Sequence, residues 1–219
     1  KLPFKLADAI VVPTEIFREL FKTDDFSFKV HKIPHVVDVE NFSNLLIKHK
    51  NTKVLIAAKS LEKYSGHTFL IDTFKELKKS MSNLELWILG DGPEKFHLQQ
   101  KVKKMNLDGV KFFGNVEHKN MPKIFNKGSI FVHATKYESF GLVLVEAMAS
   151  SLPIVVFNIG GISEIVKDGE NGYLIDFYDR PNFILAIKSL INDSDKMLRM
   201  GSCGSQDSKN YSWVNIKKL

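Results

Sequence analysis

Cysteine is almost missing from this chain, which has one, Cys203, among its 219 residues. A single cysteine excludes an internal disulfide, so we expect a reducing compartment such as the cytoplasm and no catalytic or metal role for this thiol. Long apolar runs are missing too, because none reaches the ~20 residues that a helix needs to cross a bilayer. The start, Lys1-Leu-Pro-Phe4, has neither a long apolar signal core nor a methionine, so we expect a piece of a longer chain.

Groups of metal-ligating side chains are also lacking. The seven histidines are scattered along the chain and form no short cluster with the spacing of metal ligands. His133 follows an apolar stretch, and we expect it at a strand end near the functional site rather than on a metal. We therefore predict no metal site.

Acidic residues are in the minority: the chain has 25 of them and 31 lysines and arginines, which gives a net charge of +6. The surplus is concentrated in residues 48–128, which hold sixteen lysines and eight acidic residues. Two interpretations remain open: a solvated lysine-rich surface, or attraction to an anionic membrane face or to diphosphate substrates. Nucleic acid is not expected as a partner, because the lysines fall mostly on predicted helices without interleaved aromatic residues.

The first fifty residues predict a small strand–helix–strand unit. Residues 8–12, Asp-Ala-Ile-Val-Val, are mostly apolar and predict a short buried strand. Thr14 is placed to be the N-cap of a helix over residues 15–22. A second strand is predicted over residues 28–33, followed by an irregular polar linker over residues 35–42.

Strands and helices alternate regularly from Lys53 onward. Short apolar stretches predict strands, and stretches with apolar residues at helical spacing follow them. Such alternation implies parallel pairing with right-handed crossovers, so we predict an α/β fold with a doubly wound parallel sheet of about six strands. The expected strands are residues 54–58, 84–89, 110–113, 129–133, 154–157 and 173–175, and the expected helices include residues 66–80, 119–127, 161–167 and 181–192, with another that ends near residue 105.

The most informative stretch runs from Glu138 to Glu146 and reads Glu-Ser-Phe-Gly-Leu-Val-Leu-Val-Glu. Apolar residues at helical spacing, such as Leu142 and Val145, predict that a helix begins near Gly141. Glu138 then lies on the loop before the helix, and Glu146 lies within it. The helix N-terminus between them offers unpaired N–H groups and a positive dipole end, which suit a phosphate. A phosphate seat between two carboxylates that can bind hydroxyls is typical of a sugar–diphosphate site.

Each of these residues also has a plainer interpretation. Glu146 alone could be a solvated helix glutamate, and Gly141 alone could be a turn residue. The block behind them, with an apolar strand from Pro153 and then Gly160-Gly161, makes the combination more specific. A glycine loop that opens at a strand end is the place where open α/β sheets bind ligands.

The stretch from Glu138 to Asp176 resembles the C-terminal, donor-binding domain of glycosyltransferase family four, the retaining glycosyltransferases of GT-B fold, also called glycosyl transferases group one. The resemblance covers nearly the whole chain, more weakly before residue 50, and implies a Rossmann-like sheet that forms the C-terminal half of a GT-B enzyme. The residues that match the family signature are Glu138, Phe140-Gly141-Leu142, Glu146-Ala147-Met148-Ala149, Pro153, Gly160-Gly161, Glu164, and Asp168-Gly169-Glu170-Asn171-Gly172.

The resemblance implies roles for individual residues. Glu138 is expected to hold the hydroxyls of the donor sugar near the reacting carbon, and Glu146 to accept hydrogen bonds from the ribose hydroxyls. The N–H groups of Gly141, Leu142 and Val143 are expected to meet the phosphates. The nucleotide base is expected near the loops after the second and third strands of this domain, at Gly90, Asp91, Gly114, Asn115 and Val116.

The cationic groups that stabilise a leaving diphosphate depart from the family pattern, which has an arginine after the first strand and a lysine just before a glycine. Lys59 stands at the arginine position and Gly66 matches the glycine, but Ser65 stands where the lysine is expected. Lys63 lies two positions earlier. We expect Lys59 to contact the diphosphate as a point charge rather than a fork. For Lys63, a catalytic contact and simple solvation remain open.

The resemblance further implies a domain plan. Residues 1–47 would end the N-terminal acceptor domain and form the linker, residues 48–204 would form the nucleotide-sugar donor-binding domain, and residues 205–219 would start the C-terminal crossover helix. The implied activity is that of a hexosyltransferase that uses a UDP-, GDP- or ADP-sugar without a further cofactor. The acceptor would be a lipid-linked or cell-surface glycan, at the inner face of the membrane or in the cytoplasm. Because most of the acceptor domain is missing, we expect this piece alone to be inactive.

Two alternatives stay open. One is a catalytically inactive nucleotide-binding or interaction module of the same fold, against which the presence of both glutamates argues. The other is a dinucleotide-dependent oxidoreductase, against which the missing Gly-x-Gly-x-x-Gly argues. Asp193-Ser-Asp195 matches the Asp-x-Asp that holds a metal in the other glycosyltransferase fold, but we expect it to cap a helix.

Overall fold

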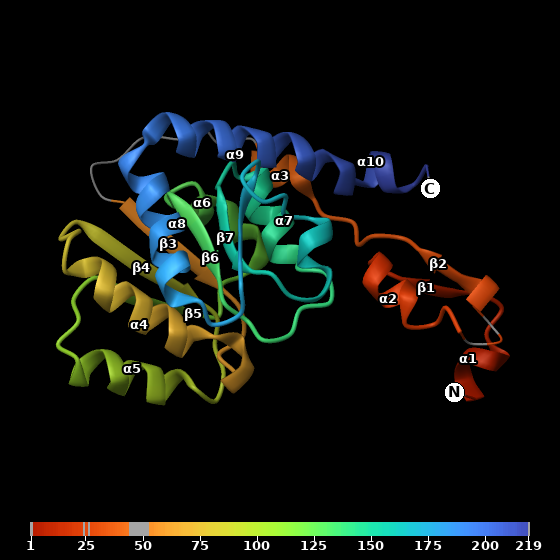
Figure 1. Cartoon of the computed structure of the whole chain (residues 1–219), viewed down its shortest axis with the longest axis horizontal. Helices are drawn as coiled ribbons and strands as arrows, with labels where there is room; N and C mark the ends of the chain where they lie inside the picture. Colours follow the sequence, from red (N-terminus) through yellow and green to blue (C-terminus); the bar gives the residue numbers. More distant parts are fainter. Residues whose placement is uncertain (1, 24, 26, 44–52, 219) are drawn as a thin grey trace.

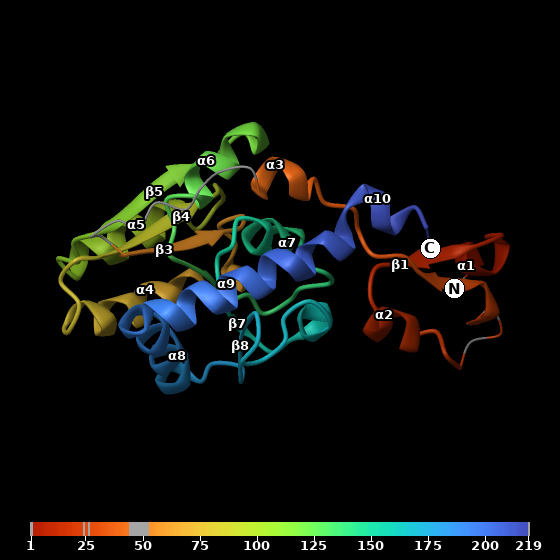
Figure 2. The same cartoon turned by 90° about the horizontal axis from the view of Figure 1, so that it is seen from above.

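The computed structural model describes residues 2–23, 25, 27–43 and 53–218. Figure 1 shows a larger body built around a sheet, with a smaller N-terminal part beside it. An extended segment joins the two parts, from β2 (Val30–Lys32) to α3 (Val39–Ser43). The last helices, α9 (Ser194–Ser208) and α10 (Trp213–Ile216), lead back from the larger body towards the smaller part (Figure 2).

The larger body contains a sheet of six strands that pair only in parallel, in the order β5-β4-β3-β6-β7-β8. The chain adds strands outwards from β3 to β5, then returns to the centre and adds β6 to β8 on the other side. This reversal sets the carboxyl ends of β3 and β6 next to each other, and such a point is where open α/β sheets bind ligands. The predicted doubly wound sheet is confirmed. Its strands are β3 (Lys53–Ala58), β4 (Leu84–Leu89), β5 (Val110–Gly114), β6 (Ile130–His133), β7 (Ile154–Phe157) and β8 (Gly172–Ile175).

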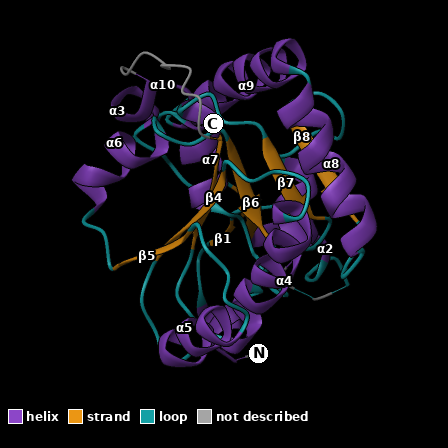
Figure 3. Cartoon of the chain, turned by 90° about the vertical axis from the view of Figure 1, so that its left-hand side faces the viewer, coloured by secondary structure: helices purple, strands orange, loops and turns teal. Residues whose placement is uncertain are grey.

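Helices cover both faces of this sheet (Figure 3). Alternate residues of a strand point to opposite faces, so Leu55 joins the apolar cluster under one helical layer and Ile56 joins the cluster under the other. Because helices cover both faces of the sheet, its strands are continuous apolar stretches in the sequence. One layer contains α4 (His67–Lys78), α5 (Lys95–Lys104) and α8 (Arg180–Asn192), and the other contains α3, α6 (Met121–Phe125) and α7 (Leu142–Ala149).

The N-terminal part is a parallel pair of short strands, β1 (Ile10–Val12) and β2, with a helix between them. The predicted strand–helix–strand unit is therefore present, although α2 (Glu15–Glu19) ends earlier than expected. The short helices α1 (Leu2–Leu6) and η1 (Ser27–Lys29) flank the unit. Ile10, Val12 and Val30 form a small core of its own.

Two predicted segments have a different structure. The irregular linker expected over residues 35–42 contains the start of α3, because Val39 and Phe42 are buried against the larger body. The helix expected over residues 161–167 is a short 3-10 helix, η4 (Gly160–Glu164). The expected boundary between residues 47 and 48 lies outside the described residues.

The C-terminal helix α9 crosses the expected domain boundary, since the break after residue 204 falls inside it. Asp193 caps this helix, with Oδ1 accepting a hydrogen bond from the N–H of Lys196 at 2.8 Å. The expected capping role of Asp193 is confirmed. Beyond α9 the chain continues through η5 (Lys209–Tyr211) into α10.

The interior of α9 contains two glycines, which lower its helix propensity and affect how closely it packs. Glycine lowers helix propensity by about 1 kcal/mol relative to alanine, and α9 has two in its interior. A Cβ on Gly201 would lie 2.2 Å from the carbonyl oxygen of Ser151, and Gly204 faces Met148 of α7. The missing side chain of Gly201 allows α9 to pack closely against the segment that follows α7.

Candidate functional site

Lys59 and Glu138 meet where β3 and β6 end. Lys59 directly follows β3, and Glu138 lies in the loop between β6 and α7. The Nζ of Lys59 lies 2.7 Å from Oε2 of Glu138, and the two side chains are 19% and 13% exposed. The backbone N–H of Lys59 also donates to the carbonyl of Leu89 at the end of β4, at 3.1 Å. The sheet topology thus forms a half-buried ion pair from residues far apart in the chain.

His133 is a second partner of this carboxylate, with Nε2 3.3 Å from Oε2 of Glu138. Burial by itself raises the pKa of Glu138, but the hydrogen bonds from His133 and Lys59 outweigh it and lower the pKa to about 2. Burial lowers the pKa of His133, so its ring is neutral at pH 7. An ionised carboxylate can only accept, so the neutral ring must carry its proton on Nε2 and donate it. As predicted, His133 lies at a strand end beside the site.

The N-terminus of α7 lies directly after Glu138. Gly141 occupies the N-cap position with a φ of +95°, a left-handed conformation that favours glycine. Within the described part of the chain, the N–H groups of Leu142 and Val143 have no hydrogen-bond acceptor. These N–H groups and the positive end of the helix dipole suit an anion.

Glu146 lies about one turn further along α7. Its Oε1 is 2.9 Å from Nε2 of His118, and its side chain is 13% exposed. Burial raises the pKa of Glu146, although the hydrogen bond from His118 acts in the opposite direction. Glu146 is therefore a half-buried carboxylate with a directed contact, and not a freely solvated helix residue.

The loops after β4 and β5 lie side by side, as the base-site prediction requires. The N–H of Gly90 donates to the carbonyl of Gly114 at 2.8 Å. Gly90 also lies against the end of β3, since a Cβ on it would be 2.1 Å from the carbonyl oxygen of Lys59. His118 follows the second loop closely, so its contact with Glu146 joins this loop to α7.

The three remaining residues of these loops differ in how accessible they are. Asn115 is exposed, and Val116 packs against the apolar cluster under α7. The carboxylate of Asp91 forms an ion pair with Lys95 and accepts the N–H of Gly92 at 2.9 Å. Asp91 is thus held mainly within its own loop.

Lys63 lies apart from the Lys59–Glu138 pair. It is exposed on the short 3-10 helix η2 (Lys63–Ser65), and among the described residues it forms no hydrogen bond or ion pair. Gly66 closes this loop at a φ of +77°, and a Cβ on it would lie 1.8 Å from the carbonyl oxygen of Ala134. The structure therefore brings Lys59, but not Lys63, to Glu138.

Two histidines of this region were not predicted. His118 carries no distinguishing pattern, and its nearness to the expected base loop was the available signal. His67 begins α4 directly after Gly66, is buried, and has no hydrogen-bond partner for Nδ1 among the described residues. Burial is the main cause that lowers the pKa of His67 to about 4, so His67 is a neutral ring behind the site.

Several lysines of the basic region are paired within the chain. Lys101 and Asp72 lie 2.7 Å apart, and Lys111 and Glu85 lie 2.8 Å apart. Such pairs are typical of a solvated charged surface, the first of the two interpretations given for this region. None of the helices in the described ranges has both the length and the apolar character that crossing a membrane would need.

The chain is similar to curated proteins from several organisms. It is 28% identical over 214 residues to an uncharacterized glycosyltransferase of Haemophilus influenzae, with 93% of this chain and 57% of that protein covered. It is 31% identical over 148 residues to the uncharacterized glycosyltransferase MJ1178 of Methanocaldococcus jannaschii, with 68% of this chain and 41% of that protein covered. The chain thus spans about half the length of these relatives.

Solved structures share the fold at lower identity. One is a mutant of TarM from S. aureus, in complex with Fondaparinux, alpha-GlcNAc-glycerol and UDP, with a TM-score of 0.88 at 23% identity. The similarity covers 98% of this chain and 43% of the TarM chain. HepE of Anabaena, in complex with UDP and glucose, has a TM-score of 0.86 at 21% identity and covers 99% of this chain, which covers 62% of HepE. Residues 38–207 match the family described as glycosyl transferases group 1, and the chain belongs to that family.

Proposed function

We propose that this chain is the donor-binding half of a retaining hexosyltransferase, which transfers a sugar from a nucleotide-diphosphate sugar to a glycan or lipid-linked acceptor. The observation that carries the proposal is the pair of half-buried carboxylates, Glu138 and Glu146, on either side of the N-terminus of α7. Both carboxylates belong to a helix start whose first N–H groups lack acceptors among the described residues, and this arrangement suits two hydroxyl-bearing rings joined by a diphosphate.

Each half of the donor has its own partners in this proposal. The diphosphate binds the N–H groups of Gly141, Leu142 and Val143, with Lys59 as the nearby cation. Glu138 accepts hydrogen bonds from the sugar hydroxyls, and its low pKa keeps it ionised for this task. Glu146 accepts hydrogen bonds from the ribose, and the base lies towards the loops at Gly90, Asp91, Gly114, Asn115 and Val116.

The described relatives support the nucleotide part of the proposal. The TarM structure contains UDP together with alpha-GlcNAc-glycerol, and the HepE structure contains UDP and glucose. Both are similar to this chain over nearly its whole length. A uridine nucleotide is therefore the first ligand to test.

No metal or other cofactor takes part in the proposed reaction. The charge that develops on the leaving diphosphate is neutralised by Lys59 and by the dipole of α7. Lys63, which is exposed and separate from Glu138, is an auxiliary cation at most. We expect the acceptor to bind to the half of the relatives' length that this chain does not span, at the cytoplasmic face of a membrane or in the cytoplasm. We therefore expect no transfer by this chain alone.

Calorimetric titration with UDP, GDP, ADP and NAD tests the proposal. Binding of a nucleoside diphosphate, strengthened when the matching sugar is attached, supports it. Binding of the diphosphate with no gain from any sugar supports the alternative of an inactive nucleotide-binding module. Preference for NAD would contradict the proposal and support a dinucleotide enzyme. Transfer of sugar by the 219-residue chain alone would contradict the expectation that a separate acceptor-binding half is needed for activity.

A further inference from the structure

We propose that Glu164 is a positioning residue that ties the small N-terminal part to the loop carrying Glu138, and thereby holds the sugar-binding carboxylate in place. The tie itself involves no ligand, whereas its effect on sugar binding rests on the proposed function. Glu164 is the last residue of η4, on the larger body. Its partners lie on α2, about 150 residues earlier in the chain.

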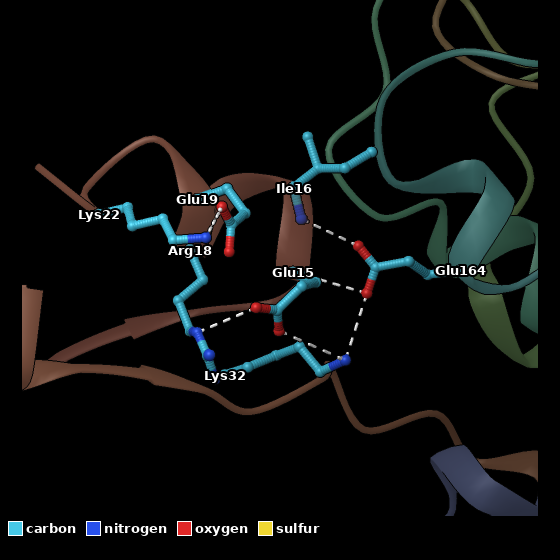
Figure 4. A network of polar contacts seen from close by, with 7 residues as sticks. All are labelled: Glu15, Ile16, Arg18, Glu19, Lys22, Lys32 and Glu164. Carbon is cyan, nitrogen blue, oxygen red and sulfur yellow. Dashed lines mark hydrogen bonds and ion pairs between the residues drawn. The ribbon is translucent and has the colours of Figure 1, made fainter.

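The carboxylate of Glu164 supplies the acceptors for the first N–H groups of α2. Oε2 accepts from the N–H of Glu15 at 2.9 Å, and Oε1 accepts from the N–H of Ile16 at 3.1 Å (Figure 4). The first N–H groups of a helix have no partner within the helix and need one from elsewhere. Thr14 occupies the N-cap position but makes no capping bond with its side chain. A residue from the larger body therefore caps a helix of the smaller part.

A lysine completes the contact on the side of β2. The Nζ of Lys32 lies 3.3 Å from Oε2 of Glu164 and 4.0 Å from Oε2 of Glu15 (Figure 4). Burial tends to raise the pKa of Glu164, but the N–H groups of Glu15 and Ile16 and the ammonium of Lys32 lower it below its ordinary value. Glu164 is thus ionised at neutral pH, and groups on both α2 and β2 stabilise its negative charge.

The other end of η4 lies against the loop that carries Glu138. A Cβ on Gly160 would lie 2.1 Å from the carbonyl oxygen of Glu138, and a Cβ on Gly161 would lie 2.4 Å from that of Ser139. Such distances leave room only for hydrogen atoms, so η4 and the loop are in close contact. A shift of η4 must therefore move the backbone of Glu138.

Thr14 closes this set of contacts. A Cβ on Gly161 would lie 2.5 Å from Cγ2 of Thr14, and the hydroxyl of Thr14 points to the carbonyl of Ser139 at 3.4 Å. The start of α2 is thus in contact with both η4 and the Glu138 loop. Because three segments from distant parts of the chain meet here, the position of the N-terminal part is coupled to that of Glu138.

Nuclear magnetic resonance of the labelled chain tests the tie without any ligand. In Glu164→Ala, the amide protons of Glu15 and Ile16 should move upfield and exchange faster with solvent, because both lose a charged acceptor. In Glu164→Gln, one oxygen remains, so one of the two amides should stay protected. Glu170→Gln, at an exposed glutamate on the next turn, is the matched control and should change neither. Unchanged amide signals of Glu15 and Ile16 in Glu164→Ala would overturn the proposal.

The coupling to Glu138 needs a separate measurement. In Glu164→Ala, the amide signals of Ser139 and Phe140 should shift, and affinity for a UDP-sugar should fall by about tenfold, the effect of losing one charged hydrogen bond. Affinity for UDP itself should stay nearly constant. Gly161→Ala should give the same pattern, because its methyl group separates Thr14 from Ser139.

If the amides of α2 respond but those of Ser139 and Phe140 do not, Glu164 is a structural cap only and the positioning role is wrong. If no variant and no parent chain binds any nucleotide, the proposed function fails, while the amide signals still decide the tie.

Discussion

His118 and Glu146 form a side-chain contact between two elements, with Nε2 of the histidine 2.9 Å from Oε1 of the carboxylate. His118 begins η3 (His118–Asn120), just after the loop that we associate with the nucleotide base, and Glu146 lies on α7. A ribose that binds Glu146 must therefore share the carboxylate with His118 or displace it. The contact gives Glu146 a fixed orientation and links it to the base loop.

The variant His118→Ala should raise the pKa of Glu146 further. Burial already raises this pKa and the hydrogen bond from His118 opposes it, so removing the histidine leaves burial unopposed. Titration of the Glu146 carboxyl by nuclear magnetic resonance measures the change. Since a protonated carboxyl accepts hydrogen bonds less well, nucleotide affinity should decline with falling pH, and the decline should begin at a higher pH in the variant. His97→Ala, at an exposed histidine of α5, serves as control, and an unchanged Glu146 pKa in His118→Ala would contradict the prediction.

The two carboxylates should fail differently when each is replaced by alanine. Glu146→Ala removes the proposed ribose acceptor, so a nucleoside diphosphate and its sugar conjugate should weaken alike. A charged hydrogen bond contributes roughly 1.5–3 kcal/mol, which is about ten- to a hundredfold in affinity. Glu138→Ala should leave the bare diphosphate nearly unchanged and remove the extra affinity that the sugar provides.

Titration of both variants with UDP and with a UDP-sugar separates these outcomes. In an enzyme of the relatives' full length that contains this chain, Glu138→Ala should also lower turnover, because the sugar is no longer held for attack. Equal loss of UDP in both variants would show that the assigned division of roles is wrong. No loss in either variant would reduce the two-glutamate stretch to a structural helix start.

Glu138 should also govern stability in acid. Its pKa falls from 4.5 to about 2 on folding, so its contribution is fully present above pH 4.5 and is lost as the pH falls towards 2. The contribution is on the order of 2 kcal/mol once solvent screening of the partly exposed pair is allowed for. Urea unfolding of the parent chain and Glu138→Gln at about pH 6 and about pH 3 should give free energies of unfolding that converge at the lower pH. A gap that does not narrow would argue against the ion pair with Lys59.

Nucleotide binding should not depend on a divalent metal. The proposed neutralising groups are Lys59 and the N-terminus of α7, so binding of UDP should be the same with and without EDTA. Lys59→Met should weaken UDP binding by about tenfold, as expected for one charged contact. Lys63→Met is the matched control, because Lys63 is exposed and separate from Glu138, and its effect should be smaller. Loss of binding in EDTA, or a larger effect at Lys63, would contradict this account.

The sheet could be predicted because it follows from the order of elements along the chain. Regular alternation of apolar and amphipathic stretches implies parallel strands, and parallel strands end at one edge. Lys59 and Glu138 each follow a strand, and the reversal between β3 and β6 makes them neighbours. The start of α7 near Gly141 could be predicted as well, since Gly141 precedes apolar residues at helical spacing.

The contacts made between distant segments could not be read in the same way. His118 reaches Glu146, and Glu164 reaches the amides of α2, only after the sheet has folded. His118 carries no distinguishing pattern, and Glu164, although it matches the family signature, has no feature in its local sequence that indicates partners on α2. The linker prediction failed for a related reason, because Val39 becomes helical where it is buried against a layer formed much later in the chain.

The glycines of α9 limit how this protein can be stabilised. Replacing a helix-interior glycine with alanine is a common way to gain up to about 1 kcal/mol. At position 204 the new methyl group would lie 3.4 Å from Cγ of Met148, an ordinary contact with a flexible side chain. At position 201 it would meet the backbone of Ser151 and push α9 away from the segment that follows α7. Of two substitutions that look equivalent in the sequence, one should raise the melting temperature and the other should lower it.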